Sequence, residues 1–253
     1  MQAKAHSTDS LELAGRFLRL HLLEHDPLDY TRTNIDRWAR ARGHTVARTY
    51  VCSGEPLPDP ADLDWLMVMG GSPHAYDNAS NPWLPAEKAF VAEALERGLP
   101  TLGICFGAQV LAEALGGEVF PAELGEIGWH EVRLTSEGRR SDLFRGVPDA
   151  FETFHWHVDR FSLPPGCTRL ASSRATPDQA FLCGERPVAG FQFHPEYTLE
   201  LVDTFAREHS EEWAPNTFVW GKDAVLARNR TMKDTYWLME AILDNLARRF
   251  LNP

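Results

Sequence analysis

Cys105 occupies a sequence environment that suits nucleophilic chemistry. It lies in the run GICFGAQ at residues 103–109, where an apolar strand-like segment passes directly into a helix-like segment. Small neighbours let a tight strand-to-helix turn present the cysteine side chain, as in a nucleophile elbow. The N-terminus of the following helix favours the thiolate, which is the reactive form. Cysteine also often fills a core position as a small apolar residue, so this spacing alone leaves a catalytic and a packing role open.

His194 and Glu196 supply the partners that a cysteine nucleophile requires. Such a nucleophile needs a base, and the base is oriented by a third group. The run His194-Pro195-Glu196 follows an apolar strand predicted at 188–193, so it falls at the carboxyl edge of the sheet, where open α/β sheets place their sites. Pro195 stiffens the turn and lets Glu196 point back toward the imidazole. From these residues alone, an ordinary loop histidine with a satisfied hydrogen bond is the alternative.

The first half of the chain predicts the scaffold that would position these groups. Strand-like segments alternate with segments of helical periodicity. The predicted strands are 17–23, 46–51, 65–71 and 101–104, and the predicted helices are 29–42, 85–97 and 106–115. Alternation of this kind favours parallel pairing with right-handed crossovers, so we predict an α/β fold with a doubly wound, mostly parallel sheet.

The second half of the chain has a different texture of short β-like runs. These runs lie at 118–120, 129–135, 150–155, 169–172, 179–183 and 188–193. We predict that much of this part is antiparallel and extends the sheet. Helical spacing predicts closing helices at 199–209 and 231–250, with an irregular surface segment at 211–229 between them. We expect a disordered leader at 1–12 and a single domain at 13–253, in which 211–253 forms an irregular C-terminal segment and helix.

Composition and charge exclude several classes of function. The 253 residues include 36 acidic and 25 basic side chains, for a formal charge of −11, and the basic residues form no runs. Nucleic acid is therefore not an expected partner. No uncharged stretch reaches the roughly 18 apolar residues of a membrane span, and the polar first ten residues lack the apolar core of a signal peptide. We therefore expect no membrane association and a cytoplasmic protein.

The cysteine spacing bears on redox state. The four cysteines are Cys52, Cys105, Cys167 and Cys183, and they contain no C-x-x-C pair. This pattern argues against a zinc ribbon and against a disulfide scaffold. We therefore expect all four to be reduced thiols.

Several spaced motifs together resemble the class I glutamine amidotransferases. The motifs are MGGSPHAYD at 69–77, GICFGAQ at 103–109, EIGW at 126–129, FHWHVD at 154–159 and HPE at 194–196. The resemblance covers residues 65–205 and is closest to stand-alone proteins similar to the glutaminase domain of GMP synthase. It implies the flavodoxin-like fold of this family, a Cys-His-Glu triad and no cofactor. In that triad Cys105 attacks the side-chain amide of glutamine, His194 is the general base and Glu196 orients it.

Three further residues are candidates for oxyanion and substrate contacts. Amide cleavage passes through a tetrahedral oxyanion, which requires preorganised N–H donors. The predicted donors are the backbone amides of Gly71, at a glycine-bearing strand end, and Phe106, the residue after the nucleophile. An ordinary turn is the alternative for the glycines. Gln109 lies one helical turn after Cys105, so the two face the same way, and the resemblance implies that Gln109 contacts the glutamine moiety of the substrate.

The segment HWHVD at 155–159 admits a metal-binding and a substrate-binding interpretation. On a strand, His155, His157 and Asp159 would share one face, but no further ligand pair at zinc spacing completes a tetrahedral set. The resemblance implies a substrate-side loop, so we predict substrate contacts by His157 and Asp159 and no bound metal. The family often has Ser-His-Gly-Asp here, and Val158 in place of glycine leaves the shape of this loop open.

Three functions are compatible with these residues. The first is a glutamine amidotransferase-type hydrolysis that releases ammonia for a separate synthase partner, since the chain has no G-x-x-x-x-G-K-[ST] nucleotide-binding loop. The second is a stand-alone hydrolase of γ-glutamyl peptides or amines, which uses the same acyl-enzyme chemistry with another leaving group. The third is a non-catalytic or latent regulatory binding protein, against which the complete set Cys105, His194 and Glu196 argues.

Overall fold

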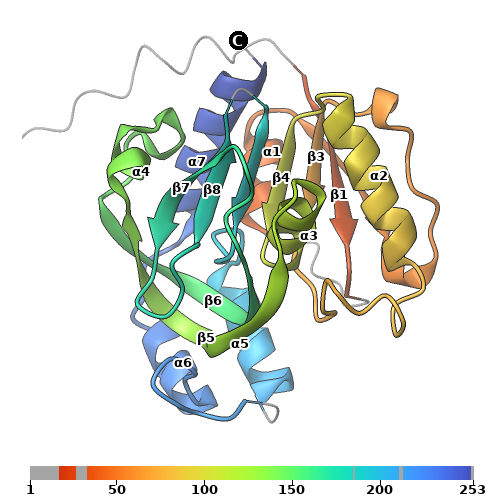
Figure 1. Ribbon diagram of the computed structural model, residues 1–253. Coiled ribbons are helices and arrows are strands. Elements are labelled where there is room, and N and C mark those ends of the chain that lie inside the picture. The colour runs from red at the N-terminus through yellow and green to blue at the C-terminus, as the bar shows by residue number, and fades with distance from the viewer. Residues whose placement is uncertain (1–16, 27–32, 185, 211–212, 252–253) are drawn as a thin grey trace, which may run out of the picture.

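The protein is built on one mixed sheet with a parallel and an antiparallel part. The computed structural model describes residues 17–26, 33–184, 186–210 and 213–251, and within them nine strands pair in the order β2-β1-β3-β4-β9-β8-β7-β5-β6 (Figure 1). The parallel part consists of β2 (Thr45–Tyr50), β1 (Arg19–Glu24), β3 (Trp65–Val68), β4 (Thr101–Ile104) and β9 (Val188–Phe191). The antiparallel part continues through β8 (Ala180–Cys183), β7 (Cys167–Ser172), β5 (Val119–Leu134) and β6 (Ala150–Phe161). This topology confirms the predicted α/β fold class with its antiparallel extension.

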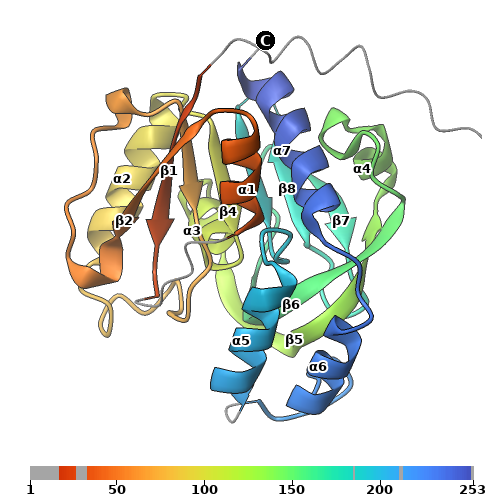
Figure 2. The same ribbon diagram turned by 180° about the vertical axis from the view of Figure 1, so that it is seen from behind.

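Helices cover both faces of the parallel part. The helices α1 (Asn34–Ala41) and α7 (Tyr236–Leu251) lie on one face, and α2 (Leu84–Glu96) and α3 (Phe106–Ala114) lie on the other (Figure 1, Figure 2). The sequence of β3 gives the reason, because Trp65 and Met67 pack into the core that contains α1 and α7, whereas Leu66 and Val68 pack into the core of α2 and α3. None of the helices in the described ranges is long and apolar enough to cross a membrane.

The first helix begins later than its sequence pattern predicts. We predict a helix at 29–42, and the structure has α1 from Asn34, while residues 27–32 lie outside the described part of the chain. Thr33 is the N-cap and forms a capping box with Asp36, which satisfies N–H groups of the first turn. The leader predicted at 1–12 also lies outside the described residues.

Two helices pack beside the long hairpin of β5 and β6, and one of them contradicts the sequence prediction. These are α5 (Leu199–Glu208) and α6 (Lys222–Asn229) (Figure 1). Because α6 lies in the segment 211–229, the prediction of an irregular segment is wrong there. In α6 the buried apolar residues are Val225 and Leu226, which pack with Ile127 of β5 in a separate small core. The helix depends on this tertiary packing, and its own periodicity is too weak to predict it. A short helix, α4 (Ser136–Arg140), likewise falls outside the predicted elements.

The segment at 155–159 is part of strand β6, so the loop implied by the family resemblance is wrong for this chain. His157 pairs opposite Glu126 of β5, and His155 pairs opposite Gly128. The strand conformation explains Val158, whose side chain is exposed on a β6 position that needs no glycine. The same hairpin joins the predicted runs at 118–120 and 129–135 into the single strand β5.

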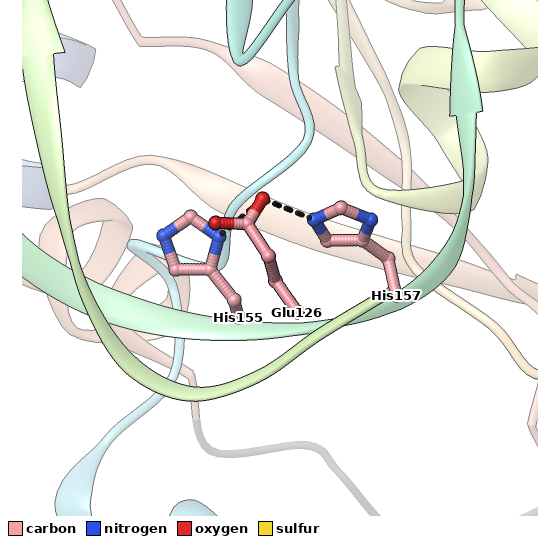
Figure 3. Close-up of side chains that lie close together, drawn as sticks. All are labelled: Glu126, His155 and His157. Carbon is pink, nitrogen blue, oxygen red and sulfur yellow. Dashed lines mark hydrogen bonds and ion pairs between the residues drawn. The ribbon is translucent and has the colours of Figure 1, made fainter. Parts of the chain in front are cut away.

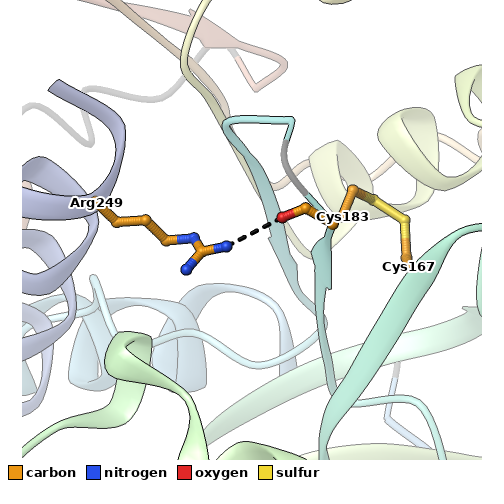
Figure 4. Close-up of a disulfide and its surroundings, with 4 residues drawn as sticks. Cys167, Cys183 and Arg249 are labelled. Carbon is orange, nitrogen blue, oxygen red and sulfur yellow. Dashed lines mark hydrogen bonds between the residues drawn. A yellow bond between two sulfur atoms is a disulfide. The ribbon is translucent and has the colours of Figure 1, made fainter. Parts of the chain in front are cut away.

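Cys167 and Cys183 form a disulfide bond, which contradicts the prediction that all four cysteines are reduced. They lie directly opposite each other on β7 and β8, with their Cα atoms 3.9 Å apart (Figure 4). Their sequence separation of 16 residues conceals this pairing until the two strands are in register. Arg249 of α7 donates from Nη2 to the carbonyl of Gly184 at 3.0 Å, beside the disulfide. The other two cysteines are free.

Candidate active site

The turn between β4 and α3 holds Cys105 in a strained backbone conformation. Its φ is 51°, and it is the one non-glycine residue with a positive φ in the described ranges. This conformation is unfavourable for an L residue and persists only where the surroundings enforce it. The turn also requires small neighbours, since a Cβ on Gly107 would lie 1.8 Å from the carbonyl oxygen of Val68. The strained turn presents the thiol to a pocket at the N-terminus of α3.

His194 and Glu196 follow β9 and form the second part of the site. His194 Nδ1 lies 2.7 Å from Glu196 Oε1, and both side chains are buried. A carboxylate accepts hydrogen bonds, so Nδ1 carries a proton and Nε2 remains for the thiol of Cys105, with which the ring interacts. The N-terminus of α1 secures this turn, because Asn34 N–H donates to the Glu196 carbonyl at 2.8 Å and Asn34 Nδ2 donates to the Pro195 carbonyl at 3.2 Å.

Electrostatics favour the charged form of His194. Burial lowers its pKa, but the negative charges of Glu196 and Cys105 and the hydrogen bonds to both raise the pKa to about 10. The neutral-pH form of the site is therefore an imidazolium held between a carboxylate and a thiolate. This form supplies a nucleophile and a proton donor at once.

A pocket of about 280 Å³ opens in front of Cys105. Seven of the eight predicted site residues line it, namely Cys105, His194, Gly71, Phe106, Gln109, His157 and Asp159. Glu196 lies behind His194 and reaches the pocket only through that ring. The site sits where the strands β4 and β9 end, which is the edge at which open α/β sheets place their ligands.

Gln192, which the sequence alone does not single out, connects Gln109 to the thiol. Gln109 Nε2 donates to Gln192 Oε1 at 3.3 Å, and Gln192 Nε2 lies 3.6 Å from Cys105 Sγ. Both glutamine side chains are buried. The available signal is its position, since Gln192 stands two residues before His194 at the end of the same apolar run. This network fixes the orientation of Gln109 at the pocket wall.

Asp159 lies at the pocket wall in a cluster with two residues of the MGGSPHAYD motif. Its Oδ2 lies 2.5 Å from His74 Nδ1, and its Oδ1 accepts from the Tyr76 hydroxyl at 3.2 Å. The rings of His74 and Tyr76 stack with their centroids 5.2 Å apart. The His74 side chain is 45% exposed, so this carboxylate lies where a cationic group of a ligand can reach it from solvent.

His157 belongs to a buried cluster beneath the pocket, where His155 and His157 flank the carboxylate of Glu126 (Figure 3). His157 Nε2 lies 3.2 Å from Glu126 Oε2, and His157 Nδ1 donates to the Asp159 carbonyl at 2.9 Å. His155 Nδ1 lies 3.9 Å from the same carboxylate oxygen. Protein groups therefore engage both ring nitrogens of His157, and the ring meets the pocket as part of its wall.

The same cluster has the composition of a metal site, since one ligand atom from each of Glu126, His155 and His157 lies within 4.8 Å of the others. Asp159, which the sequence places on this face, is not a member. Glu126 Oε2 also accepts from Gln179 Nε2 at 2.6 Å, so protein donors already occupy it. Burial raises the pKa of Glu126, but the hydrogen bond from His157 and the charges of His155 and His157 lower it to about 2. We interpret the cluster as an ionic network, and the absence of a bound metal stays a prediction.

Replacing Glu126 with glutamine is expected to lower the free energy of unfolding by about 3 kcal/mol near neutral pH. The carboxyl pKa is 4.5 in the unfolded chain and about 2 in the folded protein, so the stabilisation is present above pH 4.5 and is lost as the pH falls toward 2. Urea unfolding of both proteins across this acid range measures the narrowing difference. Adding a chelator is expected to leave both curves unchanged, and a chelator-dependent loss of wild-type stability would instead indicate a bound metal.

Comparisons with known proteins identify the family. The family model described as glutamine amidotransferase class-I matches residues 27–209. The chain is 33% identical over 202 residues to the glutamine amidotransferase-like protein YfeJ of Salmonella typhimurium, which spans 78% of this chain and 83% of that protein. It is 38% identical over 117 residues to a glutamine-hydrolyzing GMP synthase of Syntrophomonas wolfei, over 44% of this chain and 22% of that one. A crystal structure of a glutamine amidotransferase from Thermotoga maritima matches with a TM-score of 0.79 and 25% identity, over 94% of this chain and 100% of the other. The chain therefore belongs to the class I glutamine amidotransferase family.

Proposed function

We propose that the protein hydrolyses the γ-amide of glutamine through a Cys105 thioester and releases ammonia for a separate synthase partner. The observation that carries this proposal is the strained, pocket-facing Cys105 paired with the buried dyad of His194 and Glu196. A thiolate, a proton donor and an orienting carboxylate are the groups that acyl transfer from an amide requires.

The proposed reaction starts from the thiolate–imidazolium pair. The Cys105 thiolate attacks the amide carbon, and the carbonyl oxygen becomes an oxyanion that accepts hydrogen bonds from the N–H groups of Gly71 and Phe106. His194 Nε2 gives its proton to the amide nitrogen, the C–N bond breaks, and ammonia leaves. Neutral His194 then takes a proton from water, whose oxygen attacks the thioester carbon. Breaking the C–S bond releases glutamate and restores the thiolate.

The pocket offers contacts for the rest of a glutamine molecule. Gln109 is held by Gln192 with its carboxamide at the wall, where it hydrogen-bonds the substrate. The carboxylate of Asp159 suits an α-ammonium group, and the partly exposed His74 beside it suits an α-carboxylate. These groups distinguish an amino acid from a simple amide.

The proposed synthase partner follows from the names of the relatives. Several are called glutamine-hydrolyzing GMP synthases, and the chain matches only about a fifth to a third of their length. One relative, from Methanoregula boonei, is named as one of the separate subunits of such a synthase and is 33% identical over 131 residues. A glutaminase of this kind supplies ammonia to an acceptor that another polypeptide binds.

An aromatic wall next to His194 favours a second candidate, the hydrolysis of γ-glutamyl peptides or amines. The Tyr197 ring stacks on His194 at a centroid distance of 4.2 Å, and Phe205 stacks on Tyr197 at 4.9 Å. Trp156 packs against Phe205, and Trp213 against Trp156. His194 must touch the leaving nitrogen, so any substituent on that nitrogen would lie along this wall, which suits apolar or aromatic amines.

Steady-state hydrolysis separates these functions. We expect glutamine to have a higher kcat/KM than γ-glutamyl methylamide or γ-glutamyl benzylamide, measured by ammonia, amine and glutamate release. A preference for the benzylamide that Trp213→Ala removes would favour the second candidate. The absence of turnover with every substrate, in folded protein, would contradict both and leave a latent binding protein.

A further inference from the structure

We propose that His25 and Glu87 form a buried clamp that holds the Gly70–Gly71 peptide with its N–H directed into the pocket, which makes His25 a positioning residue for the oxyanion. His25 Nδ1 lies 3.1 Å from the carbonyl oxygen of Gly70, and His25 Nε2 lies 2.7 Å from Glu87 Oε1. Both side chains are fully buried. The inference rests on the proposed function, because it concerns the donor that we assign to Gly71.

The chemistry of the contacts fixes the direction of the key hydrogen bond. A carbonyl oxygen only accepts, so His25 Nδ1 carries a proton and donates it to Gly70. The carboxylate of Glu87 accepts from Nε2 and thereby holds the plane of the ring. Burial lowers the pKa of His25, but the charge and hydrogen bond of Glu87 and the hydrogen bond to Gly70 raise it above its ordinary value. The ring is then a double donor that bridges α2 and the end of β3.

The geometry of the peptide unit transmits this contact to the pocket. In a planar trans peptide the C=O of one residue and the N–H of the next point in opposite directions, and the described chain has no cis peptide bonds. Because His25 holds the carbonyl of Gly70, the N–H of Gly71 points away from His25. Gly71 lines the pocket with Cys105 and Phe106.

A clamp is needed because two consecutive glycines leave this peptide free to rotate. The rotation would turn the carbonyl oxygen toward the thiolate and remove the N–H from the oxyanion. The peptide lies close to the reacting groups, since a Cβ on Gly70 would lie 3.0 Å from His194 Cε1 and 3.6 Å from Cys105 Cβ. Glycine is therefore required for close approach, and an external contact must supply the rigidity that glycine lacks.

His25 also contacts the second proposed oxyanion donor. Its ring packs against that of Phe106 with centroids 4.6 Å apart, and it stacks on Trp83 at the start of α2 at 5.7 Å. Packing alone would not require charged groups here, because a buried ion pair is often replaceable by apolar residues without loss of stability. The fully buried pair is instead explained by the peptide that it orients.

Two double variants that share Glu87→Leu test the clamp. His25→Leu with Glu87→Leu removes every hydrogen bond of the clamp and leaves no buried charge. His25→Asn with Glu87→Leu restores one N–H donor near the position of Nδ1. We expect the first to lower the kcat for glutamine by about 100-fold with a change in KM below about 3-fold, and the second to recover about 10-fold of that loss.

A reaction without an oxyanion provides the discriminating readout. Alkylation of Cys105 by iodoacetamide needs the thiolate but no oxyanion, so its rate is expected to stay within about 2-fold of wild type in both double variants. His21→Leu, on the same strand and bonded to Thr49, is the control for a lost buried histidine and should keep full kcat. Equal kcat values for the two double variants, or an equal fall in alkylation rate, would overturn the positioning role.

The state of the peptide can also be observed without turnover. In the variant with His25→Leu, we expect the Gly70 carbonyl ¹³C resonance to move upfield and the Gly71 amide to exchange faster, because the peptide is released. Unchanged resonances and exchange would refute the clamp. Wild-type protein that hydrolyses no amide yet shows these NMR changes would refute the proposed function and leave the clamp standing.

Discussion

Replacing Cys105 with alanine is expected to lower the kcat of glutamine hydrolysis on the order of 10⁵-fold. The variant keeps the pocket, the oxyanion donors and His194, but no atom can form the thioester. Hydrolysis then depends on direct attack by water, which the site does not position. Ammonia release measures the loss, and mass spectrometry of a quenched wild-type reaction is expected to detect a glutamyl adduct that the variant lacks.

Cys52 provides the matched control for this variant. It is the other free cysteine in the described ranges and does not line the pocket. We expect Cys52→Ala to retain wild-type kcat and KM. If Cys105→Ala retained activity close to that of Cys52→Ala, or supported the host as well as wild type did, the catalytic role of Cys105 would be wrong and a binding role would explain the pocket geometry.

The parallel half of the fold could be predicted because its signals are local. Each strand there is short and apolar, and its ends are marked by glycines or by the start of a periodic helix, as in the segment at 101–104. The antiparallel half depends on contacts between distant segments. The bulge that carries β5 past Pro121, and the packing that forms α6, have no signal within their own residues. The disulfide of Cys167 escapes prediction for the same reason, because its partner is set by strand register.

The nucleophile, base and orienting acid could be predicted because each has a chemical reason to stand beside a turn. The supporting residues have no such signal. Glu87 occupies a helix position that reads as an ordinary solvent-facing acid, yet it is fully buried because His25 lies opposite it. Glu126 likewise becomes a partner of His157 only when β5 and β6 are in register. Sequence patterns identify groups that react, whereas the groups that orient them are defined by tertiary contacts.

Replacing Glu196 with glutamine is expected to lower kcat by about 10⁴-fold while the fold is retained. The carboxylate accepts the proton of His194 Nδ1 and leaves Nε2 directed at the thiol and the leaving group. A glutamine amide can donate to Nδ1 instead, and the ring then adopts the other tautomer. The charge of Glu196 also contributes to the raised pKa of His194, so removing it lowers that pKa from about 10.

The pH dependence of the Glu196→Gln variant tests this explanation separately from the loss of rate. His194 must be protonated to release ammonia, so the alkaline limb of kcat/KM is expected near pH 10 in wild type and at lower pH in the variant. Glu200→Gln, at an exposed position of α5, controls for the loss of one negative charge and should leave both rate and limb unchanged. A Glu196→Gln enzyme with a reduced rate and an unmoved alkaline limb would mean that Glu196 acts through geometry alone. If its rate stayed within about 10-fold of wild type, Glu196 would not be the orienting member of the triad.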